Sequence, residues 1–189
     1  MLIAIDGVDG VGKTTYSNAL ACFFGCRRVR SWESAKLAAK RGDSSEWSDL
    51  ERCGIRVNDS VEDLYSLDTI GVLRSNAILD RTITSAIAYN DGIGESEAAH
   101  LLGVWHVLIS RTPPPHLFVW LHAPWRISKD RTASRGEVWG DVSTVERHDA
   151  IQKRYQRLFD AILTDKIDID TETTSVLDGI QMVLKMVRR

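Results

Sequence analysis

One eight-residue stretch near the N-terminus constrains this chain more than any other feature. Residues 7–14 match the pattern G-x-x-x-x-G-K-[S/T] at every fixed position. A short apolar run precedes the stretch at residues 2–5, and a predicted helix follows over residues 13–24 and ends before Gly25. A buried strand before the motif and a helix after it are the context that a phosphate-binding loop, or P-loop, requires.

The residue types in this loop suit a nucleoside triphosphate. The glycines let successive backbone N–H groups point inward as an anion nest, and the following helix adds its positive N-terminal end. We expect the ammonium of Lys13 to reach the β- and γ-phosphates and the hydroxyl of Thr14 to bind Mg²⁺. The predicted ATP-binding residues lie in one segment and are Gly7, Asp9, Gly10, Val11, Gly12, Lys13, Thr14 and Thr15.

The rest of the chain alternates between short apolar runs and amphipathic stretches. The pattern predicts further strands at residues 28–32, 77–80, 117–121 and 167–169, and helices at residues 60–75, 82–89, 95–109, 125–133, 144–163 and 175–187. This order predicts an α/β protein with the three-layer P-loop NTPase fold, in which helices cover both faces of a five-stranded parallel sheet. A length of 189 residues fits a single domain spanning residues 1–189.

Composition and charge exclude several classes of protein. Lys and Arg number 24 and Asp and Glu 26, so the chain lacks the overall basic excess of a nucleic-acid binder, and any site for a polyanion must be local. The longest apolar runs, such as residues 117–121, are far shorter than the roughly 18 residues of a membrane span. Three cysteines without a secretory signal predict reduced thiols and a cytoplasmic protein.

A carboxylate and a guanidinium end the predicted strand at residues 77–80. Asp80 at a strand end can hold magnesium, and the neighbouring Arg81 suggests a second anion in the site. The chain has no guanine-reading Asn-Lys-x-Asp stretch, and this strand does not end in the Asp-Glu pair of motor ATPases. The pair therefore favours phosphoryl transfer to a bound phosphate, with an ordinary salt-bridged surface pair as the alternative.

Together these residues resemble the thymidylate kinase-like nucleoside monophosphate kinases. Residues 1–15, including the acidic Asp9, are similar to the P-loop of that family, and residues 79–81 followed by Tyr89 resemble its Asp-Arg-Tyr segment. Residues 131–136 resemble its arginine-bearing lid. The resemblance implies ATP-dependent phosphoryl transfer to a (deoxy)nucleoside monophosphate, giving the diphosphate. A pyrimidine deoxynucleotide such as dTMP, or a modified analogue, is the expected small-molecule acceptor.

The resemblance also implies roles for single residues. Asp9 would approach the sugar and 5′-phosphate of the acceptor, and Arg81 would clamp its phosphate. Arg74 would help to hold the base, and Ile70 stands where the family places a base-stacking aromatic residue. Tyr89 would pack under the deoxyribose. The plainer alternatives are an exposed helix charge for Arg74 and a core position for Tyr89.

Two positions depart from the family pattern. Thr82 stands where the family has Tyr or His, and Ala86 stands where many thymidylate kinases carry a polar residue near the thymine edge. Losing a hydrogen-bonding group at such a position changes base choice strongly. The sequence therefore predicts a nucleotide kinase without assigning its base.

Basic residues gather around a glycine-containing loop at about residues 134–143, which we interpret as a mobile lid. A lid arginine that closes over the γ-phosphate neutralises charge, and closure excludes water. The basic cluster consists of Arg126, Lys129, Arg131, Arg135 and Arg147. Lys13, Arg81, Arg135 and Arg131 are the predicted catalytic residues, with Arg135 ahead of Arg131 because Gly136 follows it. A solvated basic helix is the alternative.

Other functions stay open at the level of sequence. Glu33, next to Trp32, stands where deoxynucleoside kinases carry a catalytic glutamate, so a deoxynucleoside or 5-hydroxymethylpyrimidine kinase acting on a hydroxyl is one alternative. Trp32 would then flank the base. A non-catalytic ATP-binding module for sensing or assembly is another. An apolar helix face through Leu101, Leu102 and Trp105 is either a homodimer interface or internal core.

Overall fold

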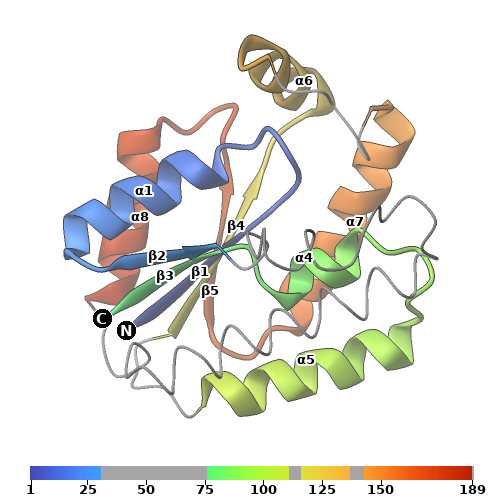
Figure 1. Ribbon diagram of the computed structural model, residues 1–189, viewed down its shortest axis with the longest axis horizontal. Helices are drawn as coiled ribbons and strands as arrows, with labels where there is room; N and C mark the ends of the chain where they lie inside the picture. The colour runs from blue at the N-terminus through green and yellow to red at the C-terminus, as the bar shows by residue number, and fades with distance from the viewer. Residues whose placement is uncertain (31–75, 111–115, 137–142, 189) are drawn as a thin grey trace, which may run out of the picture.

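The computed structural model describes residues 1–30, 76–110, 116–136 and 143–188. The elements, in chain order, are β1 (Leu2–Asp6), α1 (Lys13–Phe24), β2 (Arg27–Arg30), β3 (Ala77–Asp80), α4 (Ile83–Ala88), α5 (Glu95–Ile109), β4 (His116–His122), α6 (Trp125–Ser134), α7 (Val145–Ala161), β5 (Asp165–Asp170) and α8 (Val176–Val187) (Figure 1). The predicted helix over residues 60–75 lies outside the described residues, as do Trp32, Glu33, Ile70 and Arg74.

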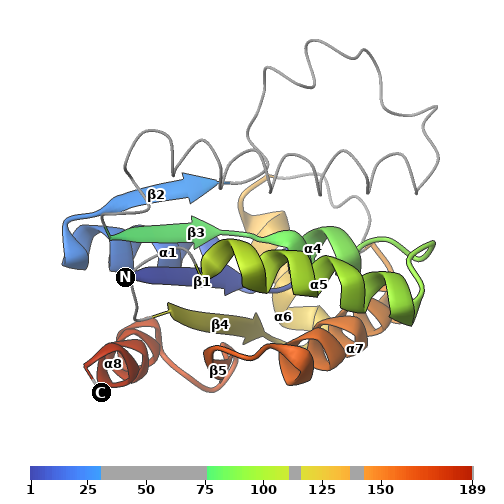
Figure 2. The same cartoon turned by 90° about the horizontal axis from the view of Figure 1, so that it is seen from below.

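Five parallel strands form one sheet in the order β2-β3-β1-β4-β5, which Figure 2 shows from edge to edge. All residues of the central strand β1 and of β3 are buried, as their continuous apolar character predicts. Helices α1 and α8 lie on one face of the sheet, and α4, α5 and α7 lie on the other (Figure 1). The predicted α/β P-loop NTPase fold is confirmed.

The helix ends follow from local sequence. Helix α1 ends at Gly25, whose left-handed backbone (φ +58°) lets its N–H donate back to Ala21 and Cys22. Thr82, Thr144 and Ser175 begin α4, α7 and α8 as N-caps, because each side chain accepts a hydrogen bond from a backbone N–H two or three residues later. The predicted bounds of these helices therefore hold to within two residues.

The apolar face of α5 turns toward the interior. Leu102 and Trp105 are buried in the main core, and Leu101 is partly buried against it. These side chains therefore form internal core, the second of the two alternatives that the sequence leaves open. None of the described helices combines the length and apolar character that a membrane-spanning helix needs.

Candidate nucleotide-binding site

The P-loop is clamped between the end of β4 and helix α6. A Cβ atom at Gly7 (φ +143°) would lie 2.1 Å from the carbonyl oxygen of Leu121, and one at Gly10 (φ +84°) would lie 2.3 Å from that of Ser128. Both the backbone angles and the space admit only glycine. The loop is thus held in its curled form by two neighbouring backbones.

Lys13 lies inside this loop rather than in solvent. Its side chain is buried, and its Nζ donates to the carbonyl oxygen of Val8 at 2.5 Å and lies 3.7 Å from Oδ1 of Asp9. Burial, together with the charge of Arg81, lowers the pKa of Lys13 to about 8, although Asp9 opposes the change. The ammonium is therefore held where it can meet a bound phosphate.

Arg81 forms a second cationic group beside the loop. It occupies the turn between β3 and α4 with a left-handed backbone (φ +74°), which is uncommon for a residue with a side chain and is typical of functional sites. Its guanidinium forms an ion pair with Asp9 and lies 5.5 Å from the centre of the Tyr89 ring. Burial alone would raise the pKa of Asp9, but Arg81 and Lys13 outweigh it and lower that pKa to about 2.

Tyr89 joins the same cluster at the C-terminal end of α4. Its hydroxyl accepts a hydrogen bond from the backbone N–H of Asp9 at 2.9 Å, and its ring packs edge-on against Tyr155. Burial is the main cause that raises the pKa of Tyr89. The structure thus brings together Asp9, Arg81 and Tyr89, the described residues that the sequence predicts for the acceptor, but Tyr89 is largely buried and partly serves as core.

Thr14 and Asp80, the two residues that the sequence predicts for the metal, lie close together. The hydroxyl of Thr14 lies 3.5 Å from Oδ2 of Asp80, and Ser17 donates to the same oxygen at 3.3 Å. Within the described residues there is no group of three or more His, Cys, Asp or Glu side chains that could hold a metal. A few hard oxygen donors suit Mg²⁺, which takes its remaining ligands from phosphates and water. The two residues therefore fit the predicted metal.

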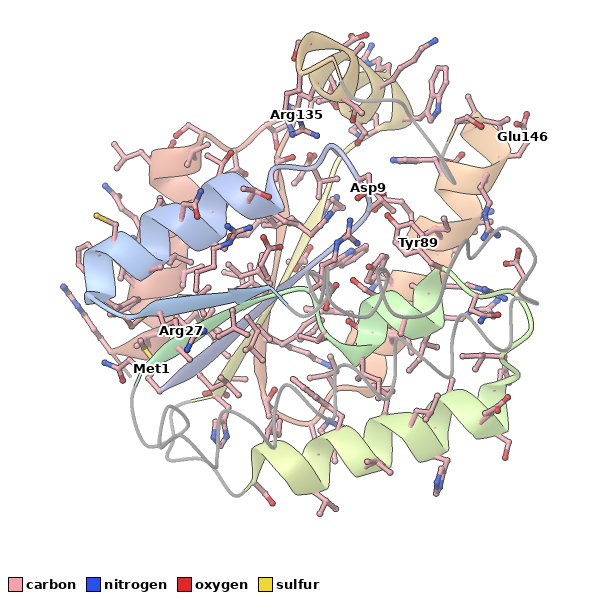
Figure 3. All side chains as sticks on the ribbon, in the orientation of Figure 1. Met1, Asp9, Arg27, Tyr89, Arg135 and Glu146 are labelled. Carbon is pink, nitrogen blue, oxygen red and sulfur yellow. The ribbon has the colours of Figure 1, made fainter. Side chains whose placement is uncertain are left out.

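A cavity of about 620 Å³ continues from the P-loop toward the C-terminal helix. It is lined by Gly10–Gly12, Thr15, Tyr16, Arg131, Ser134, Arg135 and residues 171–176. Arg131 donates to the hydroxyl of Thr171 at 2.8 Å and to its carbonyl oxygen at 2.7 Å, so it fixes α6 to the segment after β5. Arg135 is exposed at the end of α6, on the P-loop side of the molecule (Figure 3).

Some basic residues of the expected lid cluster have other roles. Arg147 forms an ion pair with Asp91 and donates to the carbonyl oxygen of Tyr89 at 2.9 Å, so it ties α7 to the end of α4. Arg147 therefore has structural partners outside the predicted lid. Of the lid itself, residues 137–142 lie outside the described part of the chain.

Thr82 and Ala86, the two departures from the family pattern, lie inside the protein. The hydroxyl of Thr82 donates to Asp6 at 2.5 Å and caps α4, and Ala86 is fully buried. Their immediate effect is therefore on the packing of α4.

Asp6 and Arg28 are polar residues near the site to which sequence reasoning assigned no role. Asp6 ends β1, is fully buried, and accepts hydrogen bonds from Thr82, Thr84 (2.6 Å) and Ser85. Burial raises the pKa of Asp6 despite these donors. A carboxylate ending a buried strand was a signal that could have found Asp6. Arg28 contacts Asp80 across 52 residues of chain, which no local pattern reveals.

Comparison with known proteins shows which solved structures share this fold. No protein-family model and no curated protein matches the chain. Among solved structures, the chain is similar to deoxyadenosine kinase from M. mycoides with bound dATP, at a TM-score of 0.69 and 15% identity over 100% of both chains. It is also similar to the YorR protein from Bacillus subtilis in complex with phosphorylated GDP, at a TM-score of 0.65 and 18% identity over 100% of this chain and 96% of that one. At such identities the likeness shows a shared fold.

Proposed function

We propose that this chain transfers the γ-phosphoryl group of ATP to a nucleoside monophosphate. One observation carries the proposal: Lys13 of the P-loop and Arg81 of the β3–α4 turn both lie against the single carboxylate of Asp9. Two cations that share one carboxylate leave a net positive charge beside the N-terminal end of α1. That arrangement suits two phosphate groups, one from the donor and one from the acceptor.

Each residue then has a simple task. Lys13 and the loop N–H groups bind the β- and γ-phosphates, and Arg81 holds the acceptor phosphate in line with the γ-phosphorus. An oxygen of the acceptor phosphate forms the new bond while the bond to ADP breaks. Because that oxygen is already ionised, no general base is needed. Mg²⁺ held by Thr14 and Asp80 would neutralise charge on the phosphates.

The lid, at about residues 134–143, completes the proposed site. Arg135 closes over the γ-phosphate, while Arg131 holds the wall of the cavity through Thr171. The acceptor in this proposal is a pyrimidine deoxynucleotide such as dTMP or a modified analogue, with the ring of Tyr89 beneath its sugar. The whole chain then acts as one kinase domain.

A nucleoside kinase is the second candidate, because one similar structure is named a deoxyadenosine kinase. A neutral hydroxyl acceptor benefits from a carboxylate base, and Glu33 is the residue proposed for it. Glu33 and its neighbour Trp32 lie outside the described residues, so the support for this candidate is the fold likeness and the sequence position.

A coupled assay of ADP release with Mg·ATP separates the candidates. The panel contains ribo- and deoxynucleoside monophosphates and the matching free nucleosides, with Lys13→Ala as the blank. Turnover on monophosphates alone supports the proposal. Turnover on nucleosides alone, lost in Glu33→Gln and kept in the exposed control Glu97→Gln, supports the second candidate. ADP release at the level of the blank for every acceptor contradicts both and favours a binding module.

A further inference from the structure

The carboxylate of Asp80 is held by an arginine from the neighbouring edge strand. Nε of Arg28 donates to Oδ2 of Asp80 at 3.1 Å, and its Nη2 donates to the same oxygen. This is the oxygen that faces Thr14 and Ser17. Asp80 is almost fully buried, so without a cation beside it the carboxylate would carry a large desolvation cost.

The position of Arg28 matters because the same oxygen faces the proposed magnesium site. A bare divalent cation approaching Thr14 would meet the guanidinium already bound to Asp80, and the charge of Lys13 close by. Like charges at such distances repel strongly where water is partly excluded. A metal ion that arrives on the phosphates of a nucleotide carries a net negative charge with it and is attracted by the same two cations.

The side chain of Arg28 can also move away from Asp80 into solvent. It lies on β2, an edge strand of the sheet, and its side chain is 23% exposed. The guanidinium itself can move into water at little cost, but the buried carboxylate that it leaves then needs another cation, which the arriving metal ion would supply. Asp80, by contrast, is fixed on the inner strand β3.

We propose that Arg28 prevents free divalent cations from binding to Asp80, the carboxylate of the proposed metal site. In the nucleotide-free enzyme, Arg28 neutralises Asp80 and excludes free divalent cations. When the metal ion arrives bound to the nucleotide, the Arg28 side chain moves away from Asp80. Arg28 is thus a positioning residue for the metal, and this inference rests on the proposed function in one respect: that Thr14 and Asp80 hold the metal.

Titration of the nucleotide-free, full-length protein with Mn²⁺, followed by electron paramagnetic resonance, tests the proposal without any turnover. Arg28→Gln removes the guanidinium and should tighten Mn²⁺ binding by about tenfold or more. The gain should vanish in Arg28→Gln/Asp80→Asn. Arg27→Gln is the matched control, because Arg27 is the exposed neighbour on the same strand (Figure 3) and should leave Mn²⁺ binding unchanged. Circular dichroism establishes that each variant is folded.

A second comparison does not depend on Arg28→Gln folding. In the protein with native Arg28, Asp80→Asn should leave nucleotide-free Mn²⁺ binding unchanged, yet weaken it about tenfold once a non-hydrolysable ATP analogue is present. The proposal is overturned if folded Arg28→Gln binds Mn²⁺ no more tightly than the wild type. It is equally overturned if the nucleotide-free wild type has a tight Mn²⁺ site that Asp80→Asn removes. Failure of the proposed function shows separately, as absent ADP release in proteins whose Mn²⁺ binding still responds to Arg28.

Discussion

The hydroxyl of Tyr89 accepts the backbone N–H of Asp9 at 2.9 Å, although 80 residues separate the two in the chain. Asp9 is therefore held twice by the segment after β3: Tyr89 binds its backbone, and Arg81 binds its carboxylate. The middle of the P-loop is fixed by the turn and helix that we propose to contact the acceptor. The proposed donor and acceptor sides of the site thus share one hydrogen-bonded unit.

Removing the Tyr89 hydroxyl should loosen that unit. Tyr89→Phe leaves the N–H of Asp9 without this acceptor, so we expect a loss of about 1–2 kcal/mol in the free energy of unfolding. The KM for the acceptor should rise several-fold, because the carboxylate that holds Arg81 becomes less well placed. Urea unfolding and steady-state kinetics measure the two effects. Unchanged values for both would show that the hydrogen bond positions nothing.

The lowered pKa of Lys13 predicts proton uptake on nucleotide binding. In the free protein this pKa is about 8, and bound phosphates must raise it, since they favour the charged form. Between pH 8 and about 10, binding of ADP should therefore take up a proton, and affinity should fall as the pH rises through this range. Calorimetry at pH 8.5 in two buffers of different ionisation enthalpy measures the uptake. The exposed control Lys153→Ala should retain it, and equal heats in both buffers would contradict the prediction.

Much of the fold follows from local sequence. The P-loop glycines, the capping residues Thr82 and Ser175, and the continuous apolar character of residues 117–121 each act within a few positions of the chain. Local signals of this kind give the elements, and a parallel sheet follows from their alternation. The strand order and the residues that face one another at the strand ends do not follow from such signals.

The contacts that complete the site are long-range. Asp6 meets the hydroxyl of Tyr155 across 149 positions at 3.3 Å, and Arg28 meets Asp80 across 52. No periodicity links such pairs, because their meeting depends on which strands become neighbours. The hydrogen bonds of Arg131 and Arg147 could not be predicted from the sequence for the same reason, since their partners lie on other elements.

The buried carboxylate of Asp6 should make stability depend on pH. Its pKa is raised above the unfolded value near 4, so the folded state binds the extra proton, and this contribution to stability is lost as the pH rises through the raised pKa. Asp6→Asn should remove that slope. It should also cost about 1–3 kcal/mol, because the amide cannot accept every hydroxyl hydrogen bond that the carboxylate accepts. Denaturant unfolding from pH 4 to pH 8 measures both effects.

A surface substitution provides the control for Asp6. Asp130 is exposed on α6, so Asp130→Asn should change the unfolding free energy by less than about 0.5 kcal/mol. A pH slope that persists in Asp6→Asn would assign the effect to another group.

Substitutions of Arg131 in α6 and of Arg135, the C-cap of that helix, should have different effects. Arg131→Ala removes both hydrogen bonds to Thr171, so we expect a loss of about 1–3 kcal/mol in stability and weaker ATP binding. Arg135→Ala should leave the unfolding free energy nearly unchanged and lower kcat by about 10³-fold or more, if Arg135 neutralises the moving phosphoryl group. Thermal unfolding and kcat, measured on both variants, distinguish a residue that supports the cavity wall from one that closes over the γ-phosphate. The reverse pattern would exchange the two roles.

Gly179 of α8 lies directly against Tyr16 of α1, and this contact supports one wall of the cavity beside the P-loop, where we propose that the nucleotide binds. A Cβ atom at Gly179 would lie 2.2 Å from the Tyr16 hydroxyl and 2.7 Å from its ring, while Tyr16 itself lines the cavity. Gly179→Ala should therefore push the ring or α8 aside, at a cost of about 1–3 kcal/mol in stability. ATP binding should weaken several-fold, because the moved groups form the cavity wall.

Gly103 offers a matched control for this prediction. It lies in the middle of α5, and a Cβ atom there would meet nothing within 4 Å. Alanine is more favourable than glycine in a helix interior. Gly103→Ala should therefore stabilise the protein by up to about 1 kcal/mol and leave ATP affinity unchanged. Chemical unfolding and calorimetric ATP titration of the two variants measure the contrast. If Gly179→Ala behaves like Gly103→Ala, the packing of α8 against α1 does not set the shape of the nucleotide site.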